Sequence, residues 1–331
     1  MAADTSRSTY IALEDRKRHS SLWFDDGNIV LATRASIFRV HRGLLSKNSP
    51  VFSDMLSMPQ PETMEPTFDG LPIVELSDDD TDFTHILNFF YDRRYYLGGM
   101  PTTFSIVSGL LRMSTKYQVD ELRDEIISHL AIAYPRTFEK YLEAVKPEAQ
   151  LKLFPSFPGQ HFAMVTLARE TNAYILLPAA LWRSSCVGWL DITRGIVGLN
   201  GDSPRLPPND RLRCLLLRHA FGEKSIHLEH TLPRLWEAST CKERGQDGRL
   251  LKDYTPCQGR AVIKTSNHFA NHHPKLEDHH DHFTQMNGFA KWRTSVCDVC
   301  RNKAESELSS VRSSWWEQLP VMVGLPAWKD L

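Results

Sequence analysis

The chain has 331 residues, which is enough for two domains. Its 41% hydrophobic and 24% charged residues are typical of a folded globular protein, and its net charge of −1 excludes a general attraction to nucleic acid or anionic lipid. There is no apolar run long enough to span a membrane and no secretory leader, and six cysteines are too sparse for a disulfide scaffold. We therefore expect an intracellular protein of the cytoplasm or nucleus, with no membrane contact and no direct nucleic-acid contact.

The first predicted elements are two strands. Residues 25–28 have turn chemistry and lie between the apolar stretches 22–24 and 29–31. We predict that the stretch 29–31 pairs in antiparallel fashion with the strand that contains Phe38 and Val40, across residues 33–36.

Residues 37–56 predict a strand followed by helices. The alternating run 37–41 is typical of a half-buried strand, and it ends at His41. Ser49 can cap the free N–H groups of a following helix, and Pro50 suits its first turn. One apolar face of that helix contains Val51, Phe52, Met55 and Leu56. The segment has no candidate nucleophile, no phosphate-binding loop and no cluster of metal ligands, so it indicates binding rather than catalysis.

A strand at 72–76 and three amphipathic helices follow. The predicted buried stripes are Phe83, Ile86, Leu87 and Phe90; then Phe104, Val107, Leu110 and Leu111; then Val119, Leu122, Ile126, Leu130 and Ala133. A small sheet with these helices predicts an α+β unit. Contacts with local backbone groups explain His41 better than catalysis does, and a solvated helix start explains the acidic run 78–80 more simply than cation binding does. We therefore predict no enzyme here.

Several of these motifs together resemble the BTB/POZ domain. The matching positions are His41, Leu44, Ser49, Phe52, Met55 and Leu56, the strand at 72–76, the helix at 80–91, and the segments 116–119, Leu122 and 129–130. The resemblance covers roughly residues 22–134. The runs at 24–28 and 58–61 are similar to the large fungal BTB group.

The resemblance implies protein–protein association, either as a homodimer with an isologous interface or as docking of a partner. In BTB proteins that dock on a cullin scaffold, a hydrophobic residue and, two positions later, a glutamate follow the second helix. Here these positions are Gln60 and Glu62, so the glutamate is present and the hydrophobic residue is not. Residues 58–70 are compatible either with a simple connecting loop or with a loop that binds a partner. The candidate partner-binding residues are Phe52, Met55, Met58, Gln60, Glu62, Met64 and Phe68.

The second half is predicted to be mostly α-helical. Apolar faces occur at 138–145, 162–177 and 179–190, and two further helical pieces are predicted at 212–217 and 225–235. No repeat period is evident. The fungal BTB group has a similar helical extension after its domain.

Four cysteines form the one pattern that indicates a metal. Cys297 and Cys300 have the CxxC spacing by which two thiolates reach one Zn²⁺, while Cys241 and Cys257 lie far apart. Histidines between them could complete a Cys₂His₂ or Cys₃His site: His268, His272, His273, His279, His280 and His282. The alternative is a histidine-rich loop with ordinary buried cysteines. We therefore predict no cofactor, and a structural zinc ion is the one alternative that the cysteine pattern leaves open. A redox CxxC requires a helix start beside a sheet, and the sequence does not indicate that context.

The last residues are dense in aromatics. Trp315, Trp316, Leu319, Leu325 and Trp328 are expected to pack back onto the helical half, although a partner-binding segment is the alternative. The predicted organisation is a flexible lead-in at 1–20, a BTB domain at 21–134, a helical extension at 135–240, and a Cys/His region with the Trp-rich tail at 241–331.

The leading hypothesis is a non-enzymatic interaction protein, in its most specific form a substrate adaptor for a cullin-RING ubiquitin ligase. The alternatives are a transcriptional regulator that acts through BTB oligomerisation and a zinc-binding protein that uses the C-terminal cluster.

Overall fold

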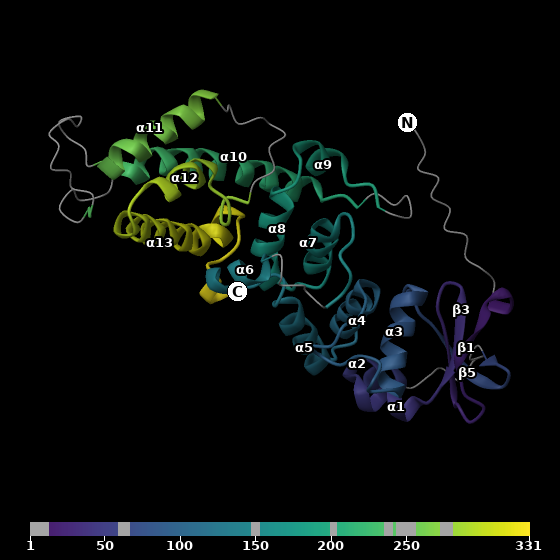
Figure 1. Cartoon of the computed structure of the whole chain (residues 1–331). Coiled ribbons are helices and arrows are strands. Elements are labelled where there is room, and N and C mark those ends of the chain that lie inside the picture. Colours follow the sequence, from purple (N-terminus) through teal and green to yellow (C-terminus); the bar gives the residue numbers. More distant parts are fainter. Residues whose placement is uncertain are drawn as a thin grey trace, which may run out of the picture. The chain divides into compact units, whose positions relative to one another are not determined.

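The computed structural model describes residues 13–58, 67–146, 153–198, 204–234, 241–242, 256–271 and 281–331 (Figure 1). The chain divides into two compact units. Unit 1 consists of Met1–Leu130 and Leu151–Pro155, and unit 2 consists of Ala131–Gln150 and Ser156–Leu331. The predicted fold class is confirmed, because the sheet and its helices lie in unit 1 and the described part of unit 2 is helical.

Unit 1 contains a five-stranded sheet, five α-helices and one 3₁₀-helix among its described residues. Its elements, in chain order, are η1 (Leu13–Asp15), β1 (Lys17–Trp23), β2 (Ile29–Ala32), β3 (Ser36–Val40), α1 (Arg42–Asn48), α2 (Pro50–Ser57), β4 (Thr67–Phe68), β5 (Leu71–Glu75), α3 (Asp80–Tyr91), α4 (Phe104–Lys116) and α5 (Asp120–Leu130).

The strands are arranged in the order β1-β3-β2-β5-β4. The predicted antiparallel pair is confirmed, since β2 pairs with β3 and Ala32 lies opposite Ile37. Strand β5 runs parallel to β2, and β1 runs parallel to β3. Strand β1 begins at Lys17, so residues 17–20 belong to the sheet and not to a flexible lead-in. Its polar N-terminal half suits an edge strand, which sequence patterns detect poorly.

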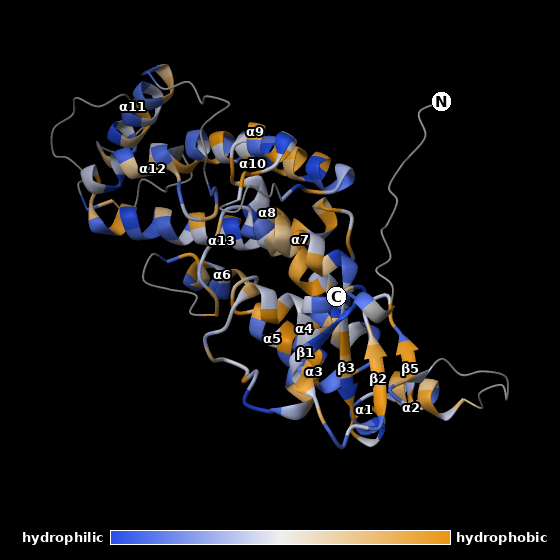
Figure 2. Cartoon of the chain, turned by 90° about the vertical axis from the view of Figure 1, so that its right-hand side faces the viewer, coloured by the Kyte–Doolittle hydropathy of each residue, from blue (hydrophilic) through white to orange (hydrophobic). Residues whose placement is uncertain are grey.

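The two faces of the sheet have separate apolar layers. On one face Phe38 of β3 packs edge-on against Phe83 of α3, with ring centres 5.4 Å apart. The opposite face carries a second cluster around Val30 and Ile73, which Trp23 and other half-buried side chains cover. Figure 2 shows the hydrophobic character of β2 and β5. A sheet that is apolar on both faces needs cover on both.

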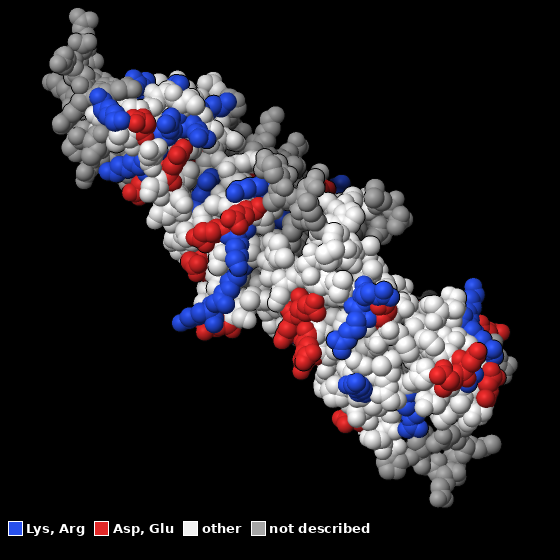
Figure 3. Space-filling model, turned by 60° about the horizontal axis from the view of Figure 1, so that its bottom comes forward, with Lys and Arg blue, Asp and Glu red and all other residues white. Residues whose placement is uncertain are grey.

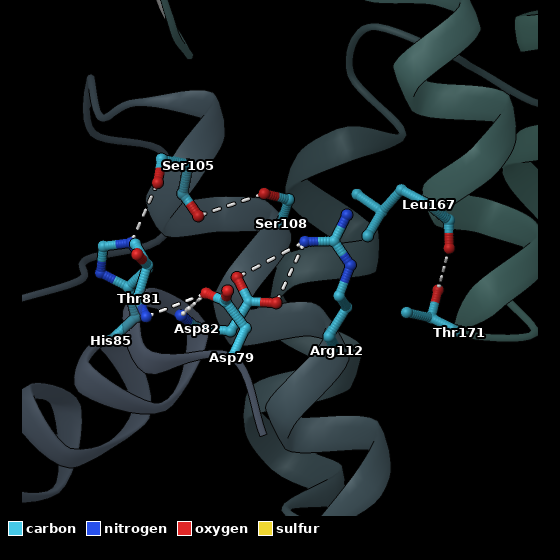
Figure 4. Close-up of polar contacts among 9 residues, drawn as sticks. All are labelled: Asp79, Thr81, Asp82, His85, Ser105, Ser108, Arg112, Leu167 and Thr171. Carbon is cyan, nitrogen blue, oxygen red and sulfur yellow. Dashed lines mark hydrogen bonds and ion pairs between the residues drawn. The ribbon is translucent and has the colours of Figure 1, made fainter. Parts of the chain in front are cut away.

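Helix α3 begins and ends where the sequence predicts, at Asp80 and Tyr91. Asp79 caps it by accepting hydrogen bonds from the N–H groups of Thr81 and Asp82. Polar side chains then join α3 to α4: His85 Nε2 lies 3.1 Å from Ser105 Oγ, and Asp82 forms an ion pair with Arg112 at 3.2 Å (Figure 4). These contacts fix the pair of helices that covers the sheet.

Unit 2 is a helical assembly in its described residues. Its elements are α6 (Phe138–Ala144), α7 (Gln160–Glu170), η2 (Tyr174–Leu176), α8 (Leu177–Ser185), α9 (Trp189–Arg194), α10 (Pro208–Thr231), η3 (Leu232–Arg234), α11 (Pro256–Asn271), α12 (Asn287–Trp292), η5 (Arg293–Ser295), α13 (Asp298–Met322) and η6 (Trp328–Asp330).

Aromatic side chains form the core of unit 2, and Phe283 lies at their centre. Its ring centre is 4.7 Å from that of Trp182 and 5.2 Å from those of Phe221 and Trp316. Trp316 also donates its indole N–H to the carbonyl of Arg136 at 2.8 Å. Most of the tail's aromatic and apolar side chains are buried, namely Trp315, Trp316, Leu319 and Trp328.

Helix α10 differs from the sequence expectation. The pieces predicted at 212–217 and 225–235 belong largely to one helix of 24 residues, Pro208–Thr231. Its buried stripe continues through the gap between them, from Leu217 to Phe221 and Ser225. Gly222 weakens the helical signal there by about 1 kcal/mol, and packing of the stripe outweighs that cost.

Candidate functional site

The end of α2 presents apolar side chains at the surface of unit 1. Met55 and Leu56 are half-buried, and Met58 directly after the helix is 65% exposed. Arg42 of α1 donates to the carbonyl of Leu56 at 2.7 Å, which ties this end of α2 to the preceding helix. We call Met55, Leu56 and Met58 the α2 surface.

The start of α2 is anchored in the core. Ser49 Oγ accepts the N–H of Phe52 at 3.1 Å, and the same hydroxyl donates to the carbonyl of Tyr117 at 2.7 Å. Ser49 is 1% exposed, so both bonds are protected from water. The predicted cap is therefore present, and it also joins α2 to the end of α4.

Phe52 does not lie on the surface. Its side chain is fully buried, and its ring stacks on that of Tyr117 with centres 4.2 Å apart and an angle of 6° between planes. Phe52 therefore supports α2 from beneath, and no partner can contact it in this fold. The reason is that the apolar face of α2 is wider than the contact surface, and its inner edge belongs to the core.

Among the remaining predicted partner-binding residues, the structure describes Phe68. Phe68 of β4 is half-buried and packs edge-on against Trp23, with ring centres 6.2 Å apart, on a face of the sheet. Gln60, Glu62 and Met64 lie outside the described residues.

His41 has structural partners. Its Nδ1 lies 2.8 Å from the hydroxyl of Tyr91, and its Nε2 lies 3.2 Å from a carboxylate oxygen of Asp26. Its backbone N–H also donates to Tyr91. These contacts are structural, but they differ from the local backbone contacts that the sequence predicts, because both partners are side chains and Tyr91 lies 50 residues away in the chain.

The acidic run 78–80 is likewise used within the fold. Asp79 caps α3, and Asp80 accepts hydrogen bonds from Thr33 at 2.6 Å and from the N–H of Ala35. Asp78 accepts the Tyr117 hydroxyl at 2.6 Å and the Lys116 ammonium at 2.5 Å.

Sequence reasoning missed the Asp78 contact, because its partners are 38 and 39 residues away in the chain. Burial raises the pKa of the Tyr117 phenol, and the hydrogen bond to Asp78 raises it further. Tyr117 therefore stays protonated and remains a donor to Asp78.

The comparison with protein families decides the nature of unit 1. The model of the BTB/POZ domain matches residues 23–131. Residues 23–131 form a BTB/POZ domain. No curated protein matches the chain. BTB domains are generally interaction modules rather than enzymes, so the domain identifies this part of the protein as a protein-binding module. Within the described ranges, none of the helices combines the length and apolarity that crossing a bilayer requires.

A second site lies in unit 2, where all four predicted cysteines meet. The Sγ atoms of Cys241, Cys257, Cys297 and Cys300 lie within 4.8 Å of one another. Cys257 is the second residue of α11, Cys297 is the N-cap of α13, and Cys300 lies in the first turn of α13. Three of the four are at most 5% exposed, and only Cys297 is half-buried.

The described cluster consists of cysteines without a histidine. His268 lies on α11, and His282 lies beside the ring of Trp182. His272, His273, His279 and His280 lie outside the described residues.

Hydrogen bonds surround the cysteine sulfurs. The N–H of Cys297 donates to Cys257 Sγ at 3.3 Å, and the guanidinium of Arg260 donates to the same sulfur at 3.4 Å. Burial raises the pKa of Cys257 to about 11. Burial also acts to raise the pKa of Cys297, but hydrogen bonds from the backbone of Cys300 and Lys242 outweigh it and lower that pKa to about 7.

The helix start that a redox CxxC needs is present, contrary to the sequence expectation, because Cys297 caps α13. The adjacent sheet is not found among the described residues of unit 2. Two further thiols beside the pair also distinguish this cluster from an exposed dithiol.

Proposed function

We propose that this protein is a non-enzymatic interaction protein whose BTB domain associates with another copy of itself through the α2 surface. The observation that carries the proposal is the match of residues 23–131 to a family whose members generally bind proteins. A homodimer would place each α2 surface against its twin, as an isologous interface requires.

The α2 surface suits this role in two ways. Met58 is exposed, and a methionine adapts its flexible, polarizable side chain to an apolar partner. The helix beneath it is held by the Ser49 cap and by the buried Phe52 ring, so little order has to be gained on binding.

A substrate adaptor for a cullin-RING ubiquitin ligase is the more specific form of the proposal. Met58 and Glu62 offer an apolar side chain and a carboxylate close together in sequence, whereas Gln60 replaces the hydrophobic residue that cullin-docking BTB proteins carry. In this form the helical unit would hold the substrate. The cysteines are sparse and free, which supports a reducing compartment, the cytoplasm or nucleus, as the place where the protein acts.

The net charge of −1 does not favour the alternative of a transcriptional regulator that binds DNA directly. Figure 3 shows acidic and basic side chains interspersed over the visible face of the described residues. Binding to the phosphate backbone depends instead on a concentration of basic groups.

The test compares two matched substitutions in the full chain, Met58→Glu and Met100→Glu. Both methionines are exposed in unit 1, by 65% and 56%, but Met100 lies outside the α2 surface. Light scattering after size exclusion should show weaker self-association for Met58→Glu and none of this loss for Met100→Glu. If the two variants self-associate equally well, the α2 surface is not part of the interface.

A pull-down with a cullin scaffold tests the adaptor form separately. Recovery of the scaffold by the unmodified chain and its loss with Met58→Glu would support the adaptor. If the unmodified chain recovers no cullin, the adaptor form is wrong, while self-association stands on its own measurement.

A further inference from the structure

We propose that Cys241, Cys257, Cys297 and Cys300 bind one structural Zn²⁺ that fastens α11 and the segment at 241–242 to the start of α13. The four sulfurs come from three stretches of chain that are far apart in sequence, yet their Sγ atoms all lie within 4.8 Å of one another. This assignment goes beyond the BTB domain, since every ligand belongs to unit 2.

The sulfur geometry suits a tetrahedral ion. Zn–S bonds of about 2.3 Å place the ligands of a tetrahedral Zn(Cys)₄ site about 3.8 Å apart. The observed upper limit of 4.8 Å needs only a small inward movement of the side chains to reach that spacing. Disulfides would instead join the sulfurs in pairs, and all four cysteines are free thiols in the structure.

The surroundings suit the excess negative charge of four thiolates around one divalent cation. Arg260 donates to the sulfur of Cys257 at 3.4 Å. Cys297 and Cys300 lie at the start of the 25-residue helix α13, where free N–H groups and the helix dipole favour negative charge. Such outer hydrogen bonds hold the ligands of metal sites in position.

An ion pair connects two of the segments that carry the proposed zinc ligands. Lys242, directly after Cys241, lies 2.7 Å from the carboxylate of Asp298, directly after Cys297. Both side chains are exposed, so the pair links the residue after Cys241 to the start of α13 at the protein surface.

Helix α11 shows why a metal would be useful here. Its buried side chains are small or polar, Cys257, Gln258, Ala261 and Thr265, and Ile263 is 53% exposed. These buried residues contribute little apolar surface, and Phe269 adds a ring contact to His230, with ring centres 4.5 Å apart. A bound ion would join its first turn to α13, and metal binding is then coupled to folding.

The site is structural and not catalytic. Sulfur ligands would take all four positions of a tetrahedral ion, whereas catalytic zinc keeps a position open for water or substrate. Iron in a tetrahedral thiolate site is the competing occupant.

The test begins with metal analysis of the full chain, purified under reducing conditions. We expect one zinc per chain, and we expect its loss in the double variant Cys297→Ser, Cys300→Ser. The matched control is Cys186→Ser, Cys214→Ser, because these free thiols of unit 2 lie outside the cluster and donate to the carbonyls of Trp182 and Leu181. The control should keep its zinc.

A second measurement avoids variants that fail to fold. Cobalt exchanged into the unmodified chain should give the visible absorption of a tetrahedral cobalt thiolate, and chelation should speed hydrogen exchange at 256–271 while leaving unit 1 unchanged. Absence of stoichiometric metal, stoichiometric iron instead of zinc, or disulfides among the four cysteines in the reduced preparation would each overturn the proposal.

Discussion

Replacing Ser49 with alanine should loosen the connection between α2 and α4 more than loss of an ordinary helix cap does. The hydroxyl of Ser49 accepts the N–H of Phe52 and donates to the carbonyl of Tyr117. Loss of the cap costs about 1 kcal/mol, and leaving a buried carbonyl without its donor costs about 1–3 kcal/mol. We therefore expect Ser49→Ala to lower the free energy of opening by about 2–4 kcal/mol in total.

Thr103→Ala provides the matched control in the same domain. Thr103 caps α4 by accepting the N–H of Ile106 at 3.2 Å, and its side chain is exposed. This substitution removes a cap without opening a buried hydrogen bond, so its cost should be about 1 kcal/mol.

Hydrogen exchange measured by mass spectrometry can resolve the two variants within the full chain. Each 1.4 kcal/mol corresponds to about a tenfold change, so the slowest amides of α2 and α4 should exchange roughly 30 to 700 times faster in Ser49→Ala. Thr103→Ala should accelerate them by roughly tenfold or less. Equal acceleration in the two variants would refute the contribution that we assign to the Ser49–Tyr117 bond.

Three further predictions concern single side chains. Phe52→Ala should destabilise unit 1 by about 3–5 kcal/mol, measured by hydrogen exchange, because it removes a fully buried ring stacked on Tyr117; no loss would contradict its place in the core. Burial raises the pKa of Glu229 from 4.5 to about 7, so the folded state holds this proton more tightly than the unfolded state does. The stability that the folded state gains from binding this proton on Glu229 is fully present below about pH 4.5 and is lost as the pH rises to about 7. Chemical denaturation of unit 2 should therefore show stability falling across this range, and Glu229→Gln should flatten the fall; an unchanged slope would contradict the shift. Trp328→Ala should lower the melting temperature of unit 2, since this indole is 4% exposed and donates to the carbonyl of Trp316 at 2.9 Å; an unchanged melting temperature would show that the tail does not support the core.

The elements that the sequence predicts best are those with local signals. Helix α3 has an apolar stripe, an acidic start and a cap within one stretch of chain, and its observed bounds are the predicted ones. The start of α2 is similar, because Ser49 and Pro50 mark it directly. Strand β1 lacks such a signal: its first residues are polar, and its place in the sheet depends on a parallel pairing with β3.

The two candidate sites show the same limit. The face of α2 follows from helical spacing, but the spacing does not reveal that Phe52 points into the core while Met58 stays exposed. The CxxC at Cys297 is visible in the sequence, whereas the approach of Cys241 and Cys257 depends on how α11 and α13 pack. Long-range packing therefore decided which predicted residues share a surface or a cluster.

The molar mass of the full chain in solution is the most direct test of the proposed association. Light scattering over a range of protein concentrations should approach twice the chain mass of 37.9 kDa, and the Met58→Glu variant should need a higher concentration to reach it. A mass of 37.9 kDa for the unmodified chain at every concentration would contradict self-association through the BTB domain.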